Sequence, residues 1–346
     1  MLANLPLGEA APRQGDAMAI NRRDLLGYGL AAGSALWPGT ARAQSKYPDR
    51  PVKLVVPFPP GGAYDTIGRP WADRIKTLFG TVVIENMGGA GGGVGAAYAS
   101  RQRPDGYTLL LGGATTHITE GLLKTKPTFD PMKDLEPISP IAVTAFAIVV
   151  HPSVPANDLK ELVAHVKAHP GKLSYGSAGH GSLNHLTGEL FKLRAGIADL
   201  PHVPYRGAGP ALTDLLAGQI PMIVPAMTNI VLEHHRAGKL RVVAVTHHKR
   251  VTAGPELATA VEQGFPDLVA PNYIGLFAPT GVPKEVIDTV SAANLKLLAD
   301  KSYQDLLISG TFELEPPLSP AEYKRYVESE MTRWRPIVTA MGIKID

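Results

Sequence analysis

The chain has 346 residues, 45% of them hydrophobic, which is enough to bury the cores of about two domains of ordinary size. Its formal net charge is +3, from 34 basic and 31 acidic residues, and no charged run stands out. This near balance argues against a nucleic-acid partner, because such proteins concentrate Lys and Arg on one face. Cysteine is absent, which excludes disulfides, thiolate metal ligands and a cysteine nucleophile.

The first part of the chain predicts export. An arginine pair at 22–23 precedes a mildly apolar segment at 27–37, and small residues follow as far as Ala43. This is the layout of a signal peptide, and the paired arginines favour the twin-arginine route. The apolar segment is shorter than the roughly 20 residues that cross a bilayer. We therefore expect cleavage near Ala43 and a periplasmic protein, with translation starting at Met1 or at Met18.

Beyond the signal, short apolar runs bounded by Gly and Pro alternate with amphipathic segments. This alternation is typical of α/β architecture. Asp158 with Glu161, and Ser319 before Pro320, indicate the starts of two helices. The expected strands are 52–56, 82–85, 107–111, 173–175, 203–205, 220–224 and 240–245, and the expected helices are 66–79, 94–102, 158–169, 184–195, 210–217, 229–237, 284–299, 302–309 and 320–341.

Two apolar segments, at 138–150 and 273–278, bracket the middle of the chain and could cross between two lobes. Clefts between such lobes are favoured ligand sites, above all at the carboxyl ends of strands. The expected division is an export signal at 1–43, a first lobe made from 44–145 and 272–346, and a second lobe at 146–271.

The loop at 57–65 follows the first expected strand and precedes a helix. Its prolines stiffen it, while Gly61 and Gly62 leave backbone amides free to approach a ligand. The positive end of the helix points to the same place, so the loop suits an anion such as a carboxylate. Asp65 could also act simply as the N-cap of that helix.

Two further loops suggest chemistry that the rest of the sequence does not support. Glycines at 88–95 fit a dinucleotide pattern, but the next strand ends without the required acid, so we interpret them as a close backbone approach near the cleft. The loop at 175–185 contains Ser177 and Ser182, and neither lies in the G-x-S-x-G pattern of a nucleophile elbow. We interpret its hydroxyls and amides as donors to an oxyanion.

The eleven histidines do not form a recognisable metal motif. His165 and His169 are spaced i, i+4, but no H-E-x-x-H is present, so we expect no metal and no cofactor. His117 follows the third expected strand, where it would face the cleft. A buried structural role for His117 is equally compatible with the sequence.

Several motifs in one order resemble the Bug family, the substrate-binding components of tripartite tricarboxylate transporters. The similarity extends over nearly all of residues 47–342. The motifs are P-F-P-P-G-G-x-x-D at 57–65, P-D-G-Y-T-L at 104–109, Y-G-S-A-G at 175–179, H-L-T-G-E-L-F at 185–191, V-P-Y-R-G at 203–207, G-P-A-L-x-D-L-L at 209–216, A-G-K-L-R at 237–241 and G-L-F-A-P-x-G-x-P-K at 275–284.

The resemblance implies an α/β type II periplasmic-binding-protein fold, with two α/β lobes and a central ligand cleft. It also implies a protein that captures a small carboxylate for an integral-membrane tripartite transporter permease, without catalysis. We expect a monomer by default. Carried over by position, the expected ligand-binding residues are Gly61, Gly62, Ala63, Asp65, Ser177, Gly179, Ser182 and Asn184, and Thr115, Thr116 and His117 occupy a segment that usually lines the cleft in the family. We also expect ligand contact from Phe58 in the first loop and from His180, which sits at a loop position open to variation.

The sequence departs from the family pattern at two places. Pro70 interrupts the first expected helix, and Val224, Pro225 and Ala226 stand where the family often has a Phe-Asp pair. Loss of that acid would change the ligand selectivity, disfavouring ligands that carry an amino group. Two alternatives stay open at this stage, a periplasmic sensor for a membrane receptor and a secreted hydrolase that uses the 175–185 loop.

Overall fold

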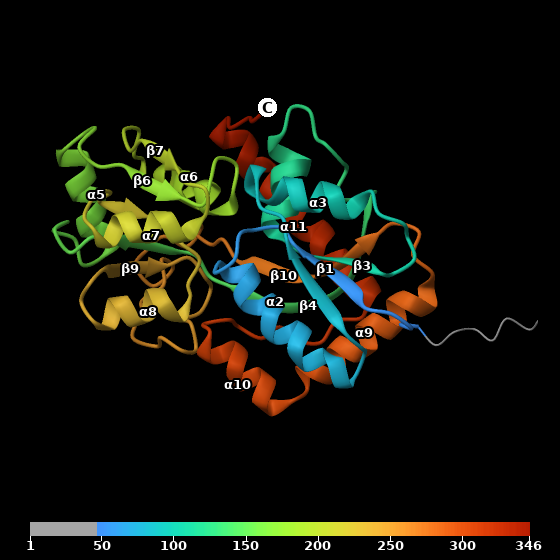
Figure 1. The fold of residues 1–346 in the computed structure, drawn as a ribbon. Coiled ribbons are helices and arrows are strands. Elements are labelled where there is room, and N and C mark those ends of the chain that lie inside the picture. The colour runs from blue at the N-terminus through green and yellow to red at the C-terminus, as the bar shows by residue number, and fades with distance from the viewer. Residues whose placement is uncertain (1–46) are drawn as a thin grey trace, which may run out of the picture. The chain divides into compact units, whose positions relative to one another are not determined.

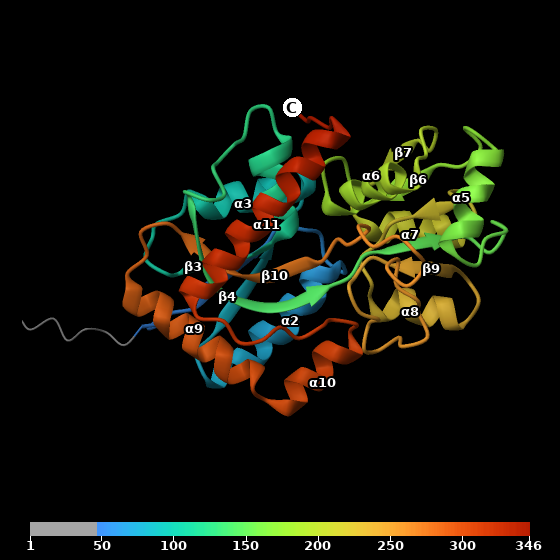
Figure 2. The ribbon, with the colours of Figure 1, turned by 180° about the vertical axis from the view of Figure 1, so that it is seen from behind.

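Residues 47–346 are the part of the chain that the computed structural model describes, so the predicted export signal lies outside the described residues. Two five-stranded sheets organise this part, and helices flank each of them (Figures 1 and 2). The predicted class, two α/β lobes, is therefore confirmed. Between residues 47 and 346 no helix combines the length and the apolar character that crossing a bilayer requires.

The first lobe contains the sheet with strand order β2-β1-β3-β10-β4. β1 is parallel to β2 and β3, whereas β10 runs antiparallel between β3 and β4. The strands are β1 (Val52–Val56), β2 (Val82–Asn86), β3 (Thr108–Gly113), β4 (Leu135–Thr144) and β10 (Asn272–Pro279), and the main helices are α2 (Ala63–Arg74), α3 (Gly93–Ser100), α9 (Lys284–Leu298), α10 (Lys301–Ser309) and α11 (Pro320–Met341).

Apolar runs without alternation form the strands of this sheet because both of its faces are buried. Leu54 packs with Trp71 of α2 in one core cluster, while its neighbour Val55 packs with Ala96 of α3 and Trp334 of α11 in another. All five of these side chains are fully buried. Because successive side chains of a strand point to opposite faces of the sheet, β1 contributes to the core on each face of the first lobe's sheet.

The second lobe contains the sheet with strand order β7-β6-β8-β5-β9. β6 is parallel to β7 and β8, and β5 is antiparallel to β8 and β9. The strands are β5 (Ala147–Val150), β6 (Tyr175–Ser177), β7 (His202–Pro204), β8 (Met222–Ile223) and β9 (Arg241–Val245), and the helices are α5 (Leu159–Ala168), α6 (Leu183–Ala195), α7 (Ala208–Leu216) and α8 (Asn229–Arg236).

Local signals for the helix starts agree with the structure where side chains act as caps. The Asp158 side chain accepts a hydrogen bond from the Glu161 amide at 2.7 Å, and Ser319 forms a capping box with Glu322. The first helix differs from the expectation, because α2 begins at Ala63 and continues through Pro70 to Arg74. A proline removes one hydrogen bond from a helix interior, and packing of the helix on the sheet compensates here.

The apolar run at 138–150 is divided between the two sheets. β4 ends at Thr144 in the first sheet, and β5 begins at Ala147 in the second. The chain returns near the same place, where β10 begins at Asn272. Hydrogen bonds tie the two crossings to the second lobe, since the Thr144 hydroxyl donates to the Met227 carbonyl at 3.0 Å and the Ala270 amide donates to the Thr246 carbonyl at 2.9 Å. Two short connections side by side are the geometry of a hinge.

Candidate functional site

The loop after β1 presents an uncapped helix start. α2 begins at Ala63 with Gly62 as its N-cap, and no side chain caps its first amides. Gly61 adopts a φ of +85°, which a residue with a side chain rarely adopts. Because the first amides of a helix have no partner inside it, those of α2 remain available to an acceptor.

Asp65 stiffens this loop from inside. One carboxylate oxygen accepts from the Gly61 amide and from Nε of Arg69, both at 2.9 Å, and the other accepts from Nδ2 of Asn86 at 3.0 Å. The same Asn86 nitrogen donates to the Phe58 carbonyl. Burial acts to raise the pKa of Asp65, but these hydrogen bonds outweigh burial and lower the pKa. Asp65, the third residue of α2, thus holds the loop in place as a charged hydrogen-bond acceptor, whereas Gly62 is the N-cap.

Replacing Asp65 with asparagine is expected to lower the free energy of unfolding by about 1 kcal/mol at neutral pH, because one hydrogen-bonded charge is lost. Since the folded-state pKa is depressed, the carboxylate stabilises the protein above the unfolded pKa of about 4, and this stabilisation disappears as pH falls through the folded pKa. Urea unfolding of both proteins between pH 3 and pH 7 measures the difference. The control is Asp199→Asn, at an exposed aspartate outside α2. An equal loss at every pH would contradict the assignment.

The glycine-rich segment at 88–95, after β2, packs closely against the loop at 57–65. A Cβ at Gly95 would lie 2.7 Å from the Met87 carbonyl oxygen and 2.9 Å from Cα of Pro57. Only glycine permits backbone this close, because real Cβ atoms do not approach other atoms within 3.0 Å. The predicted close backbone approach is confirmed at Gly95.

A second uncapped helix start comes from the other lobe. α7 begins at Ala208 with Gly207 as its N-cap, and again no side chain caps it. Tyr205, two residues before Gly207, is fixed because its amide donates to the Ser177 carbonyl at 3.1 Å and its hydroxyl to Asp214 at 2.9 Å. Side chains cap the starts of α5, α6, α8, α10 and α11. The starts of α3 and α9 are also uncapped, but those helices do not line the cavity described next.

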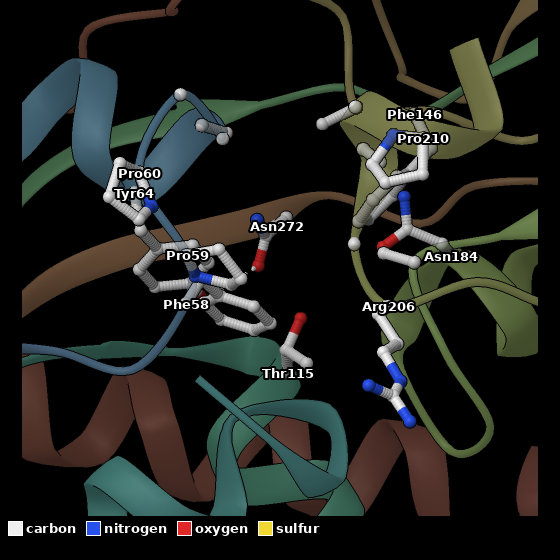
Figure 3. Close-up of a pocket in the computed structure, with 18 residues that line it drawn as sticks. Phe58, Pro59, Pro60, Tyr64, Thr115, Phe146, Asn184, Arg206, Pro210 and Asn272 are labelled. Atoms are coloured by element: carbon white, nitrogen blue, oxygen red, sulfur yellow. Dashed lines mark hydrogen bonds between the residues drawn. The ribbon is translucent and has the colours of Figure 1, made fainter. Parts of the chain in front are cut away.

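These two helix starts line one cavity of about 180 Å³. A cavity of roughly 150 Å³ accommodates benzene, so the space suits a small organic molecule. Figure 3 shows Phe58, Pro59 and Tyr64 on one side and Asn184 and Arg206 across from them. The other lining residues are Pro60, Gly61, Gly62, Ala63, Thr115, Phe146, Ala178, Gly207, Ala208, Gly209, Pro210, Ala226 and Asn272.

The side chains at the cavity give it a positive character. Arg206 is exposed and forms no hydrogen bond or ion pair within residues 47–346. None of the described residues that line the cavity is Asp or Glu. Asn272 accepts from the Tyr64 hydroxyl at 3.3 Å, and Asn184 donates to the Val224 carbonyl at 2.9 Å, so both amides are held in place. The arrangement can therefore bind an anion from two sides.

Some of the residues predicted from the sequence line this cavity and others do not. Phe58, Gly61, Gly62, Ala63, Thr115 and Asn184 lie at it. Thr116 and His117 are fully buried and turn away from it, because only the first turn of the short helix α4 (Ala114–Ile118) reaches the cavity. Burial lowers the pKa of His117 to about 4, and its Nδ1 donates to the Gly113 carbonyl at 3.0 Å.

The loop between β6 and α6 uses most of its polar groups internally. The Ser177 hydroxyl contacts Nε2 of His202 at 2.7 Å and the Gly179 carbonyl at 3.1 Å, while Ser182 caps α6. His180 is exposed. Of this loop only Ala178 lines the cavity, so Ser177, Gly179, His180 and Ser182 do not, nor does Asp65. Within residues 47–346 no carboxylate is hydrogen-bonded to His202, and a Ser-His-acid triad is therefore incomplete there.

Sequence reasoning missed the loop at 206–210. The V-P-Y-R-G motif was visible, but no ligand role was assigned to it. The available signal was Gly207 directly before a helix, the same pattern as Gly62 in the first loop. Asn272 was missed because it starts a buried strand, where an amide gives no sign of facing a cavity.

Comparison with known proteins gives a consistent set of similarities. Residues 69–343 match the family model described as tripartite tricarboxylate transporter family receptor. Protein BugT of Bordetella pertussis is 33% identical over 303 residues, which cover 86% of this chain and 91% of BugT.

Two solved structures from Rhodopseudomonas palustris have the same fold. Rpa4515 with adipate is 32% identical, with a TM-score of 0.81 over 86% of this chain and 99% of that one. MatC with bound malate is 29% identical, with a TM-score of 0.79 over 84% of this chain and 100% of that one.

Proposed function

Because this chain belongs to the family of tripartite tricarboxylate transporter receptors, we propose that it is a periplasmic solute-binding protein that captures a small carboxylate. It acts as a monomer and delivers its ligand to the membrane permease of such a transporter. The predicted export signal at 1–43 supports the periplasmic location. The similar structures MatC and Rpa4515 hold malate and adipate, and both molecules are dicarboxylates, which makes dicarboxylates the first candidates.

The observation that carries this proposal is the pair of uncapped helix starts at one cavity. The amides that follow Gly62 and Gly207 come from different lobes, and both lack a side-chain cap. Each helix start favours negative charge, and Arg206 adds a cation that has no hydrogen-bond or ion-pair partner among residues 47–346. Ala226 lines the cavity, and it belongs to the segment 224–226 that stands where the family often has a Phe-Asp pair. The cavity wall therefore favours a carboxylate over an ammonium group.

The binding mechanism follows from the position of the hinge. A ligand first contacts the amides of one lobe, and rotation about the crossings at 144–147 and 270–272 then brings donors from the other lobe. Closure excludes water, which strengthens the charged hydrogen bonds. The closed surface is the state that the permease recognises. No covalent step is needed, so the site works by positioning donors.

A ligand screen tests this proposal. We expect malate or adipate, or another dicarboxylate of similar length, to raise the melting temperature, because a ligand at 100 times its Kd adds about 2.7 kcal/mol of stability. The matched control is the diamide of each acid, which has nearly the same shape without charge and is expected to give no shift. Calorimetric titration then gives Kd and stoichiometry. Equal shifts with acids and diamides, or no shift with any acid, would contradict a carboxylate site.

A further inference from the structure

Three histidines outside the cavity come together from three elements. His180 belongs to the loop before α6, His185 to the first turn of α6 and His202 to the start of β7. One ring nitrogen from each lies within 4.8 Å of the other two. The rings of His185 and His202 stack with their centroids 3.9 Å apart, and the His180 ring lies 4.9 Å from that of His185.

Burial and neighbouring cations act on the two inner histidines. Burial, followed by the charges of neighbouring histidines and Lys192, lowers the pKa of His185 to about 3. Burial, followed by the charges of His180 and Lys192, lowers the pKa of His202 to about 4. Glu189 faces the same region and pairs with Lys192 at 2.9 Å, which partly neutralises that cation. Neutral imidazoles offer a lone pair, which is the form that binds a metal ion.

Ser177 supplies an outer hydrogen bond of the kind that orients metal ligands. Its hydroxyl donates to the Gly179 carbonyl at 3.1 Å, so it can accept from Nε2 of His202 at 2.7 Å. With its proton on Nε2, His202 keeps a free lone pair on Nδ1. A hydrogen bond to the second ring nitrogen is the usual companion of a metal-bound histidine.

We propose that His180, His185 and His202 bind a divalent transition-metal ion of the Zn²⁺ class. Imidazole is a preferred ligand of Zn²⁺, Ni²⁺ and Cu²⁺, and three imidazoles with one water complete a tetrahedral shell. Zn–N distances near 2.0–2.1 Å place neighbouring ligand nitrogens about 3.4 Å apart, so the cluster must contract. His180 can move inward, because it is exposed and lies between Gly179 and Gly181. The stacked rings of His185 and His202 must also turn toward one point, because imidazole lone pairs lie in the ring plane.

His185 limits the affinity of this site. Its Nδ1 accepts a hydrogen bond from the Gly181 amide at 3.2 Å, which places the proton of the neutral ring on Nε2. Metal binding through Nδ1 displaces that bond, and binding through Nε2 requires the proton to move. A reversible site is therefore expected, weaker than a closed structural zinc site.

A bound ion would fix one wall of the ligand cavity. The loop from Ser177 to Ser182 includes Ala178, which lines the cavity, and Asn184 lies one residue before His185. A metal held by His180 and His202 ties this loop to β7. The metal site is separate from the carboxylate site and does not depend on the proposed function.

The experiment measures Zn²⁺ binding by titration calorimetry and Co²⁺ binding by visible absorption, on the full chain without a histidine tag. We expect one ion per chain, and a loss of about tenfold or more in affinity for His180→Ala and for His202→Ala, since even outer-shell changes cost that much. His180 is exposed, so that variant tests the site without disturbing the core. Circular dichroism shows whether each variant is folded.

The matched control is the double change His165→Ala and His169→Ala. These residues are i, i+4 neighbours on and just after α5, with ring centroids 4.5 Å apart, and they offer only two ligands. Full affinity in this control supports the three-histidine site. The proposal is overturned if the unchanged protein binds neither ion, or if His180→Ala binds as well as the unchanged protein. It is also overturned if the double change His165→Ala and His169→Ala abolishes binding while His180→Ala and His202→Ala do not.

Discussion

Replacing Arg206 with alanine is expected to weaken binding of a small dicarboxylate by about 1.5 to 3 kcal/mol, the value of a hydrogen bond to a charged group. This corresponds to a rise in Kd of about ten- to hundredfold. Stability is expected to change little, because Arg206 is exposed and has no hydrogen bond or ion pair within residues 47–346. Its removal leaves no buried group without a partner, so the loss falls on the ligand alone.

Titration calorimetry of Arg206→Ala, Arg206→Lys and Arg194→Ala measures this effect. Arg194 lies in the last turn of α6, away from the cavity, and its removal changes the net charge equally. Lysine keeps the charge but not the planar fork that binds a carboxylate through two hydrogen bonds, so an intermediate Kd is expected. If Arg206→Ala and Arg194→Ala bind the ligand equally well, Arg206 has no direct role.

Replacing Gly113 with alanine is expected to lower the free energy of unfolding by about 3 kcal/mol or more, at the upper end of overpacking effects. A Cβ at this position would lie 2.1 Å from the Tyr273 carbonyl oxygen and 2.8 Å from the Tyr64 hydroxyl. The nearest atom belongs to the backbone of β10, which cannot move without opening its pairing with β3. The change also displaces Thr115 at the cavity, so ligand binding falls together with stability.

Urea unfolding followed by circular dichroism measures this loss against Gly209→Ala. Gly209 lies in the first turn of α7, and a Cβ there would have no atom within 4 Å. Because alanine is favoured over glycine in a helix, we expect the control to be unchanged or more stable by about 0.5–1 kcal/mol. A Gly113→Ala protein as stable as this control would show that β3 and β10 can separate locally at little cost.

The sequence was most informative where local rules decide the structure. Apolar runs such as 52–56 became strands because both faces of the sheet are buried, and Ser319 before Pro320 marked the start of α11. Strand ends were less predictable. The strand expected at 173–175 lies at Tyr175–Ser177, because pairing with β7 and β8 sets which residues of this short segment join the sheet.

Some residues of the site were also predictable from local rules, and others were not. Gly62 was predictable because a glycine between a strand and a helix leaves backbone amides free. His117 was not, because whether a side chain at the end of β3 faces the cavity or the core depends on the turn of α4. The three histidines at 180, 185 and 202 have no characteristic spacing, since the parallel pairing of β6 with β7 brings them together.

The place of β10 in the first sheet has a consequence for how the chain folds. β10 lies between β3 and β4, so Asn272–Pro279 must join strands that precede it by more than 120 residues. During synthesis, the edges of β3 and β4 that later pair with β10 therefore stay unpaired while the whole second lobe emerges. Contacts this distant in sequence slow folding, and exposed strand edges invite aggregation. We expect the second lobe to fold first, and a chain truncated before Asn272 to need a chaperone.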